Sequence, residues 1–311
     1  MEIIRDIENR NPAHISVLTL GTFDGIHLGH QAIIKEVNRE AKRLKAVSTL
    51  LTFEPHPQLV LNNENLPLLK LLTDINERID ILSHLDLAQL VVIPFTREFA
   101  ETSPESFVKE LLVDKLNMKS IIIGHDHVFG KNRAGNYQLL ESLGESLSFN
   151  VKTIEAVVND QQAISSTLIR SYLENGLIEK ANRYLGRPYA IRGKVIPGLG
   201  RGRKLGYPTA NITPAFVYKL IPKPGIYTST ISINGGRYNS VTYIGSRSTF
   251  DLQENVVEVH IFDFSGELYN ADVELSFYHF IREDARYTSS EELISQIKMD
   301  IERSRELLQC S

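Results

Sequence analysis

Residues 18–30 combine residue types that suit phosphate chemistry at a point where an expected strand runs into a helix. Three glycines allow the backbone to pass close to a ligand, because glycine carries no Cβ; they are Gly21, Gly25 and Gly29. The start of the helix offers unpaired N–H groups and the positive end of a dipole, which attract an anion. His27 and His30 are three apart, so they project toward the same side of the first turn. Two imidazoles in that place suit the stabilisation of a phosphate in its transition state.

Residues 164–170 form a second segment with phosphate-binding character. Hydroxyls at a helix start, followed by an arginine one turn into the helix, can hold a triphosphate or a departing pyrophosphate. The side chains concerned are Ser165, Ser166, Thr167 and Arg170. Each segment alone also fits a plainer interpretation. The two histidines would suit a solvated helix start or a partial metal site, and the hydroxyls an ordinary N-cap beside a surface arginine.

Residues 193–211 contain five glycines and four basic side chains. This composition predicts a mobile cationic flap that binds phosphates. The flap residues that we expect to contact ATP are Gly193, Lys194, Gly198, Arg201, Gly202 and Arg203. A glycine- and arginine-rich loop also occurs in RNA-contacting hairpins, but this one has no interleaved aromatic residues and the chain is not basic overall.

Thr209 and Asn211 are two apart on an expected strand, so both side chains point to one face. A hydroxyl and an amide oxygen are hard ligands that suit Mg²⁺ shared with ATP phosphates. Further along, residues 257–264 alternate between apolar and polar, which places Glu258 on the same face as His260. A glutamate there can take the proton of a hydroxyl that attacks the γ-phosphate, although a solvent-facing strand glutamate would show the same pattern.

The elements that position these residues follow from hydrophobic periodicity. Apolar runs alternate with amphipathic helical segments in the first part of the chain, which is the pattern of a parallel α/β sheet. We expect strands at 16–21, 46–53, 90–94, 120–124 and 151–158, and helices at 166–174 and 178–184. From Tyr189 onward, short period-two runs broken by turn residues indicate an antiparallel barrel or sandwich. These runs are 226–233, 238–244, 256–264 and 272–278.

The chain ends in an expected helix, where Ser289 and Glu292 have the spacing of a capping box. We therefore predict an α/β domain over residues 1–185 and a β domain over residues 186–311. The length of 311 residues fits two domains, and 42% hydrophobic with 23% charged residues is an ordinary globular composition.

Composition and charge exclude several classes of protein. A net charge of -4 argues against a dedicated nucleic-acid binder. The single cysteine, Cys310, rules out disulfides within one chain and indicates a reducing compartment. The start of the sequence lacks the features of a signal peptide, and no apolar run approaches the roughly 20 residues that span a bilayer. We expect a cytoplasmic protein with neither a nucleic acid nor a membrane as partner.

The string at 21–30 resembles the signature of flavin adenylyltransferases, a branch of the nucleotidylyltransferase superfamily, and residues 164–170 resemble the second motif of that family. Residues 52–57 and 124–131 are also similar to family segments, and both follow strand ends, where ligands of open α/β sheets bind. The resemblance implies that His27 and His30 are catalytic. It implies that ATP is bound by Gly21, Phe23, Asp24, Gly25, Gly29, Ser165, Ser166, Thr167 and Arg170. It implies that the flavin is bound by Pro55, His56 and Asp126.

The Pro-Thr-Ala-Asn core at 208–211 resembles the motif of riboflavin kinases, and residues 281–287 resemble the segment that encloses the flavin in that family. The resemblance implies that Glu258 is the general base and that Thr209 and Asn211 hold Mg²⁺. It further implies that the flavin in this domain is bound by Arg282, Arg286 and Tyr287.

With its motifs in family order over nearly the whole chain, the sequence is similar to the bifunctional riboflavin kinase/FMN adenylyltransferase family, also called prokaryotic FAD synthetases. The implied fold is a Rossmann-like nucleotidyltransferase domain, of class α/β, followed by a six-stranded Greek-key β-barrel with a C-terminal helix. The implied activity is phosphorylation of riboflavin to FMN and adenylylation of FMN to FAD. ATP is the co-substrate of both steps, and Mg²⁺ serves both.

The chain departs from the family pattern at a few places. His127 and Val128 stand where Phe and often Arg are usual, Tyr243 where Asn is common, and Ser248 where Pro is common. The first departure motivates an alternative, a riboflavin kinase whose transferase domain is weak or inactive. A flavin-sensing regulatory protein is a second alternative, although pure binding needs no general base. A class I tRNA synthetase fragment is a third, since 27–30 matches that signature too, but nothing resembles a tRNA-binding appendage.

Overall fold

The structure is a computed structural model that describes residues 1–7, 12–62, 68–124, 128–131, 134–159, 162–198, 200–249 and 252–309. Asp126, His127 and Cys310 therefore lie outside the described residues, as does the side chain of Ser248. The chain forms two compact units, Met1–Ser165 and Ser166–Ser311. This packing boundary precedes the functional boundary that we expect near residue 185, which stays a prediction.

The first unit contains a six-stranded parallel sheet with the strand order β1-β4-β3-β2-β5-β6. Its strands are β1 (Glu2–Ile4), β2 (Ser16–Leu20), β3 (Val47–Glu54), β4 (Gln89–Pro94), β5 (Met118–Gly124) and β6 (Asn150–Ile154). The order reverses between β2 and β5, and ligands of Rossmann-like sheets bind at that switch point, beyond the carboxyl ends of the strands. The predicted strands are confirmed, except that the last of them ends at Ile154 instead of continuing to residue 158.

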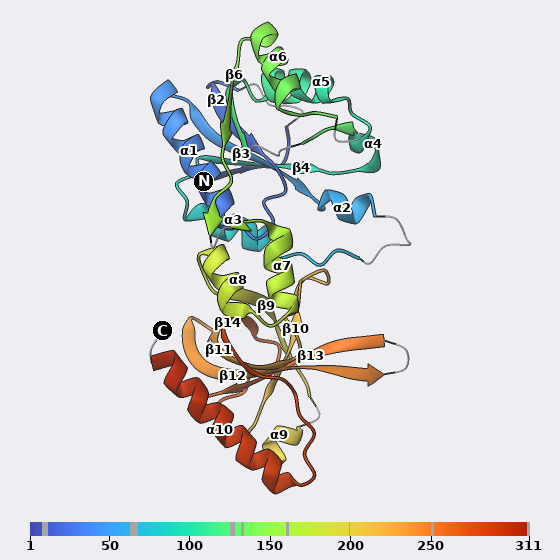
Figure 1. Cartoon of the computed structure of the whole chain (residues 1–311), viewed down its shortest axis with the longest axis vertical. Helices are drawn as coiled ribbons and strands as arrows, with labels where there is room; N and C mark the ends of the chain where they lie inside the picture. The colour runs from blue at the N-terminus through green and yellow to red at the C-terminus, as the bar shows by residue number, and fades with distance from the viewer. Residues whose placement is uncertain are drawn as a thin grey trace. The chain divides into compact units, whose positions relative to one another are not determined.

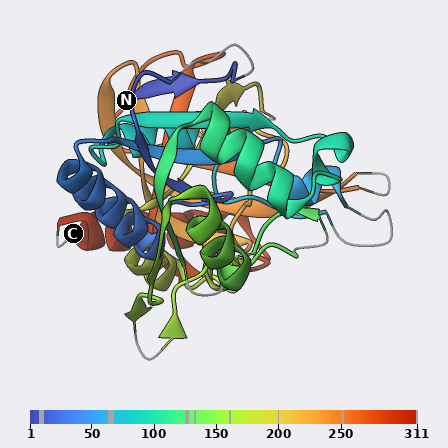
Figure 2. The same cartoon turned by 90° about the horizontal axis from the view of Figure 1, so that it is seen from above.

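Helices cover both faces of this sheet (Figures 1 and 2). They are α1 (Leu28–Leu44), α2 (Pro57–Val60), α3 (Ile75–Ser83), α4 (Arg97–Ala100), α5 (Pro104–Ser106), the π-type helix η1 (Phe107–Lys115) and α6 (Tyr137–Leu147). Leu50 of β3 packs with α1 and α3, whereas the next residue, Leu51, packs with η1 and α6 on the opposite face. Such strands are apolar on both faces, as expected for a parallel sheet between two helical layers. A short hairpin follows, formed by β7 (Val158–Asn159) and β8 (Gln162–Ala163).

The second unit is a closed antiparallel barrel with the order β10-β13-β12-β11-β14-β9. Its strands are β9 (Tyr189–Ile196), β10 (Ala210–Pro214), β11 (Gly225–Ile233), β12 (Gly236–Thr249), β13 (Leu252–Ile261) and β14 (Asp272–Arg282). Three of these strands, β11 to β13, follow one another as neighbours, and β14 returns beside β11, which is the Greek-key arrangement. The six-stranded Greek-key barrel expected from the sequence is confirmed.

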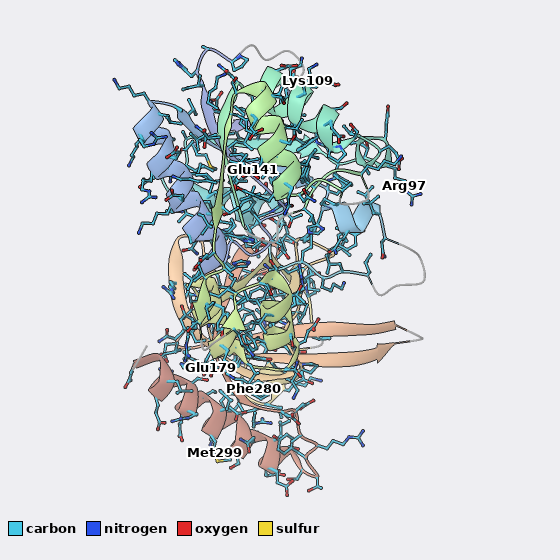
Figure 3. All side chains as sticks on the ribbon, turned by 45° about the horizontal axis from the view of Figure 1, so that its top comes forward. Arg97, Lys109, Glu141, Glu179, Phe280 and Met299 are labelled. Carbon is cyan, nitrogen blue, oxygen red and sulfur yellow. The ribbon has the colours of Figure 1, made fainter. Side chains whose placement is uncertain are left out.

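Helices α7 (Ser166–Glu174), α8 (Ile178–Leu185), α9 (Arg201–Lys204) and α10 (Ser290–Gln309) complete the second unit. The carboxylate of Glu179 in α8 lies 3.1 Å from Nδ1 of His279 in β14. Figure 3 labels Glu179 and the neighbouring β14 residue Phe280. α8 therefore packs against the barrel wall. Among the described helices, none combines the length and the apolar character needed to cross a membrane.

The cap of α10 differs in one detail from the predicted capping box. The Ser289 hydroxyl accepts a hydrogen bond from the Glu292 N–H at 3.2 Å, as expected. The Glu292 carboxylate accepts hydrogen bonds from the N–H of Thr288 at 3.1 Å and from its hydroxyl at 2.9 Å, in addition to a backbone hydrogen bond with Ser289. Thr288, one residue upstream of the usual reciprocal pair, thus takes part in capping the helix as well.

Candidate active sites

The loop between β2 and α1 adopts an unusual backbone conformation. Phe23, Gly25 and Ile26 have φ angles of 49°, 82° and 40°. Positive φ is rare for residues with a Cβ and costly for a β-branched one, so the loop persists only because its surroundings hold it. Phe23 and Ile26 are buried to 3% and 0% exposure and pack in the core beneath the loop.

The two predicted catalytic histidines stack on each other at the start of α1. Their ring centroids are 3.6 Å apart with 18° between the planes. Nδ1 of His27, the N-cap residue, accepts the N–H of His30 at 3.3 Å. A neutral His27 therefore carries its proton on Nε2 and presents a donor there. The ring of Phe23 lies 4.8 Å from that of His30 and packs against the pair.

The carboxylate of Asp24 faces the protein interior and is 2% exposed. It accepts hydrogen bonds from the N–H of Leu72 at 3.0 Å and of Thr73 at 2.9 Å. The Thr73 hydroxyl also accepts from the N–H of Gly25 at 2.8 Å. Asp24 thus ties the loop to the segment before α3, while its predicted contact with ATP stays a prediction.

The segment predicted to bind the flavin in this unit lies at the carboxyl end of β3 and includes Glu54, Pro55 and His56. The Glu54–Pro55 peptide is cis. His56 is 6% exposed and caps α2, with Nδ1 accepting the N–H of Gln58 at 3.2 Å. Both β2 and β3 therefore end in a loop whose histidine caps a helix, and these loops leave the same edge of the sheet.

The second phosphate motif begins beside the histidine loop. A Cβ placed on Gly29 would lie 3.1 Å from the His27 ring and 3.7 Å from the carbonyl oxygen of Ile164. Ile164 directly precedes the predicted phosphate ligand Ser165, which is exposed and belongs to the first unit. The other residues of this motif begin α7 in the second unit; they are Ser166, Thr167 and Arg170.

In the second unit, the structure brings together the three residues at the centre of the predicted kinase site. The Thr209 hydroxyl donates to Oε2 of Glu258 at 3.2 Å. Asn211 in β10 is the direct cross-strand partner of Glu258 in β13, so the two side chains share a face. Val257 and Val259 are 2% and 0% exposed, which confirms the predicted alternation and places Glu258 on the outer face of the barrel.

The glycine-rich loop rests on these residues. A Cβ on Gly198 would lie 2.0 Å from Nδ2 of Asn211, and one on Gly202 would lie 2.3 Å from the Tyr207 carbonyl oxygen and 3.3 Å from the Thr209 hydroxyl oxygen. Glycine is therefore required at both places for a close approach of the backbone. The loop contains one helical turn, α9, which includes Arg201, Gly202 and Arg203.

Two further flap residues belong to strand β9. Gly193 faces the neighbouring strand so closely that a Cβ would lie 2.2 Å from the Thr213 carbonyl oxygen. Lys194 lies 3.3 Å from the carboxylate of Asp272 in β14. Both residues have a clear part in joining strands, and their predicted contacts with ATP stay predictions.

A continuous row of outward-facing residues crosses the barrel at the level of Glu258. Its members are Asn211, Glu258, Tyr243, Ile226 and Arg282, each paired with the next across adjacent strands. The Tyr243 hydroxyl donates to Asp284 at 2.9 Å. The residue that departs from the family pattern thus holds the segment predicted to enclose the flavin.

The three residues of segment 281–287 that are predicted to bind the flavin have different environments. Arg282 makes a bidentate ion pair with Asp300 of α10, at 2.9 Å through Nε and 2.7 Å through Nη2, and so joins β14 to the last helix. Its guanidinium lies 5.9 Å from the centre of the Tyr287 ring. Burial raises the pKa of Tyr287. Arg286 is exposed.

Comparisons with known proteins agree with this architecture. A family model described as FAD synthetase matches residues 9–168, and one described as riboflavin kinase matches residues 185–308. A relative named bifunctional riboflavin kinase/FMN adenylyltransferase, from Buchnera aphidicola subsp. Schizaphis graminum, is 38% identical and aligns over 97% of both chains. The chain belongs to the bifunctional riboflavin kinase/FMN adenylyltransferase family.

A further family member and a solved structure are similar to this chain to a comparable degree. The Listeria monocytogenes protein is 37% identical over 93% of this chain and 91% of its own. A solved structure described as a macrolide-efflux protein from Streptococcus pneumoniae superposes with a TM-score of 0.89 at 30% identity, over 97% of this chain and 98% of its own. The family relationship therefore extends over both units.

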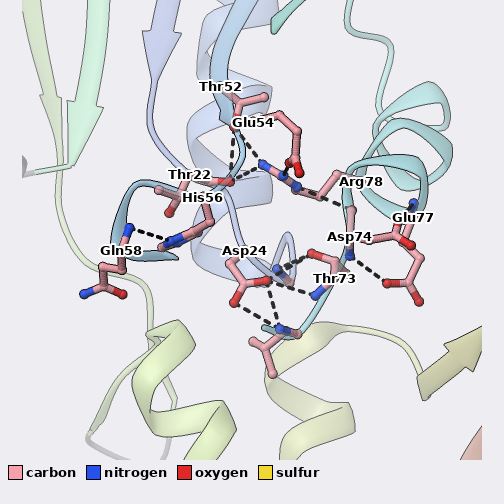
Figure 4. Close-up of polar contacts among 12 residues, drawn as sticks. Thr22, Asp24, Thr52, Glu54, His56, Gln58, Thr73, Asp74, Glu77 and Arg78 are labelled. Carbon is pink, nitrogen blue, oxygen red and sulfur yellow. Dashed lines mark hydrogen bonds and ion pairs between the residues drawn. The ribbon is translucent and has the colours of Figure 1, made fainter. Parts of the chain in front are cut away.

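Sequence patterns missed the residue that organises the back of the histidine loop, Arg78 in α3. It is 2% exposed and donates to Thr22, Thr52 and Glu54 (Figure 4). A signal for it exists, because Arg78 lies among Ile75, Ile79 and Leu82 at helical spacing, on the face that should be apolar. A charge in such a stripe indicates a buried ion pair.

Proposed function

We propose that this chain converts riboflavin to FMN in the barrel and FMN to FAD in the first unit, using ATP in each step. The observation that carries the proposal is the presence of two separate reactive arrangements in one family member. One is the stacked His27–His30 pair at a helix start. The other is the contact of Thr209 with Glu258 beside Asn211 on the barrel surface.

In the kinase step, Glu258 takes the proton of the ribityl 5′-hydroxyl, whose oxygen then attacks the γ-phosphorus of ATP. The bond from the γ-phosphorus to the bridging oxygen breaks, and ADP leaves. The Thr209 hydroxyl orients the Glu258 carboxylate by donating to Oε2. The glycine-rich loop over Asn211 supplies backbone N–H groups and basic side chains to the phosphates.

The donor set at the kinase site fits Mg²⁺. Thr209, Asn211 and Glu258 offer a hydroxyl, an amide and a carboxylate oxygen, and Mg²⁺ prefers such hard oxygen ligands together with substrate phosphates. We propose that Thr209 and Asn211 hold the ion. When bound, it would neutralise charge on the ATP phosphates.

In the adenylyl transfer step, an oxygen of the FMN phosphate attacks the α-phosphorus of ATP. The bond to the β-phosphate breaks, and pyrophosphate leaves. The attacking phosphate is already ionised, so the protein does not need a general base. Nε2–H of His27 and the imidazole of His30, at the positive end of α1, stabilise the charge that develops on the α-phosphate.

The flavin product profile tests this function. Purified protein is incubated with ATP and Mg²⁺ and with either riboflavin or FMN, and the flavins are separated by chromatography. We expect FMN and FAD from riboflavin, and FAD from FMN. FAD failing to form from supplied FMN would support the alternative of a riboflavin kinase with an inactive transferase domain. The absence of both products would exclude both enzyme functions and favour a binding protein.

A further inference from the structure

Arg78 is buried at a place where a charge is costly. Its side chain is 2% exposed and lies on the apolar face of α3, beside Leu82. Removing a guanidinium from water is energetically costly unless its donors are satisfied. Burial lowers the pKa of Arg78 and raises that of its partner Glu54, while the attraction between the two charges opposes both shifts. The protein therefore retains this charge against a considerable desolvation cost.

The donors of Arg78 reach the ends of two different strands (Figure 4). Nη1 donates to the Thr22 carbonyl oxygen at 2.8 Å, in the loop after β2, and to the Thr52 hydroxyl at 2.9 Å, in β3. Nη2 donates to the Glu54 carboxylate at 2.7 Å, at the end of β3. The Thr52 hydroxyl donates in turn to the Thr22 carbonyl oxygen at 3.2 Å, which closes the network.

Each of these anchors adjoins a segment assigned to a different substrate. Thr22 directly precedes Phe23, the positive-φ residue whose ring packs on His30. Glu54 directly precedes Pro55 and His56, the segment predicted to bind the flavin. One guanidinium thus joins the loop on the ATP side to the loop on the FMN side, from behind both.

We propose that Arg78 is a positioning residue for adenylyl transfer, which sets the separation between the histidine loop and the Glu54–His56 segment without touching either substrate. This inference rests on the proposed function of the first unit. Reacting atoms must approach within about 3–3.5 Å in alignment, and a misplacement of about 1 Å costs about 100-fold in rate. Since each substrate keeps its own binding segment, a loosened junction should lower kcat much more than it raises either KM.

The first test is Arg78→Lys. The lysine keeps the charge, but its single ammonium group lacks the planar arrangement of donors with which the guanidinium contacts both strand ends. We expect kcat for FMN adenylylation to fall by about 10- to 100-fold, with KM for FMN and ATP changed less than about threefold. Riboflavin phosphorylation by the same protein should be unchanged. The matched control is Arg39→Lys, on α1 of the same unit, where the side chain is 74% exposed and pairs with Glu36 one turn away.

A second pair of variants separates positioning from packing and does not depend on removing the buried charge. Thr52 is 1% exposed. Thr52→Val keeps the shape and loses the hydroxyl, whereas Thr52→Ser keeps the hydroxyl and loses a methyl group. If the hydrogen-bonded network positions the loops, the serine variant should retain kcat and the valine variant should lose about tenfold. If only packing matters, the order is reversed.

The inference is overturned if Arg78→Lys keeps the wild-type kcat, if the loss falls on KM, or if the valine variant at position 52 equals or exceeds the serine variant. Should Arg78→Lys fail to fold, the Thr52 pair decides alone. These outcomes are distinct from a failure of the proposed function, in which the wild-type protein itself would make no FAD from FMN.

Discussion

The histidine loop of the first unit and the Glu258 row of the second are held by different means. The loop, with residues at positive φ, is held from behind by the buried side chains of Asp24, Thr73 and Arg78. The row is set by the backbone register of β10, β13 and β12. A site held by buried side chains should be sensitive to changes far away in sequence, whereas a site held by strand register should respond mainly to changes of the reacting groups themselves.

The largest expected effect breaks the second site alone. Glu258→Gln removes the general base, so the rate of FMN formation from riboflavin should fall by about 10²–10⁴-fold. Conversion of FMN to FAD should stay at the wild-type rate, because the two arrangements share no residue. Both rates are measured by chromatography of the flavins. The control is Glu267→Gln, an exposed residue in the turn before β14. Loss of both activities would contradict separate sites.

The reverse experiment changes the first site. His30→Ala removes one imidazole of the stacked pair, and we expect FAD formation from FMN to fall by about 10²–10³-fold while riboflavin phosphorylation persists. The control is His84→Ala, at an exposed position just after α3. A normal rate of FAD formation in the His30 variant would exclude a catalytic role for the pair.

A smaller effect is expected at the edge of the Glu258 row. Tyr243→Phe removes the hydroxyl that donates to Asp284 and leaves the ring. One exposed hydrogen bond contributes about 0.5–1.5 kcal/mol, so we expect KM for riboflavin to rise about two- to tenfold with little change in kcat. Tyr269→Phe, at a residue that is 50% exposed, serves as the control. A fall in kcat comparable to that of the Glu258 variant would show that this site, too, depends on side-chain contacts away from the reacting groups.

The smallest effect concerns stability at low pH. Hydrogen bonds from Arg43, and then from Lys152, lower the pKa of Glu40 from 4.5 to about 2. A lowered folded-state pKa contributes stability that is present above pH 4.5 and is lost as the pH falls toward 2. The free energy of unfolding, measured with denaturant between pH 4.5 and 2, should therefore fall more steeply with pH for the wild-type protein than for the Glu40→Gln variant. The exposed Glu145→Gln serves as the control. Equal slopes for Glu40→Gln and the wild type would contradict this assignment.

The difference between the two sites also explains what could be predicted from sequence. Strand register carries the period-two alternation, so the outward position of Glu258 followed directly from its valine neighbours. The role of Arg78 did not, because it depends on contacts with Thr22 and Glu54, which are 56 and 24 residues away. The pairing of Arg282 with Asp300 was missed for a related reason. Its two members lie in different elements, and neither shows a periodic signal.

Family patterns and local contacts also give different information about the same residue. The Asp24 position was assigned to ATP by resemblance, and its carboxylate accepts hydrogen bonds from the N–H groups of Leu72 and Thr73. A residue can be required for ATP binding because it shapes the loop, without reaching a phosphate itself. Periodicity predicts elements well, but such indirect roles become visible only when the contacts of the folded chain are known.

The closed barrel has one more consequence. Because β9 and β10 pair with each other, the barrel closes, and most of its backbone N–H and C=O groups are unavailable as a template for another chain. The exception is the outer part of the β12–β13 hairpin, where residues 245–249 and 252–256 pair with each other beyond the ends of β11 and β10. In the part of the chain that the structure describes, open strand borders therefore lie along this hairpin and at the edges of the sheet in the first unit. There β1 is only three residues long, which limits the backbone available for accidental pairing.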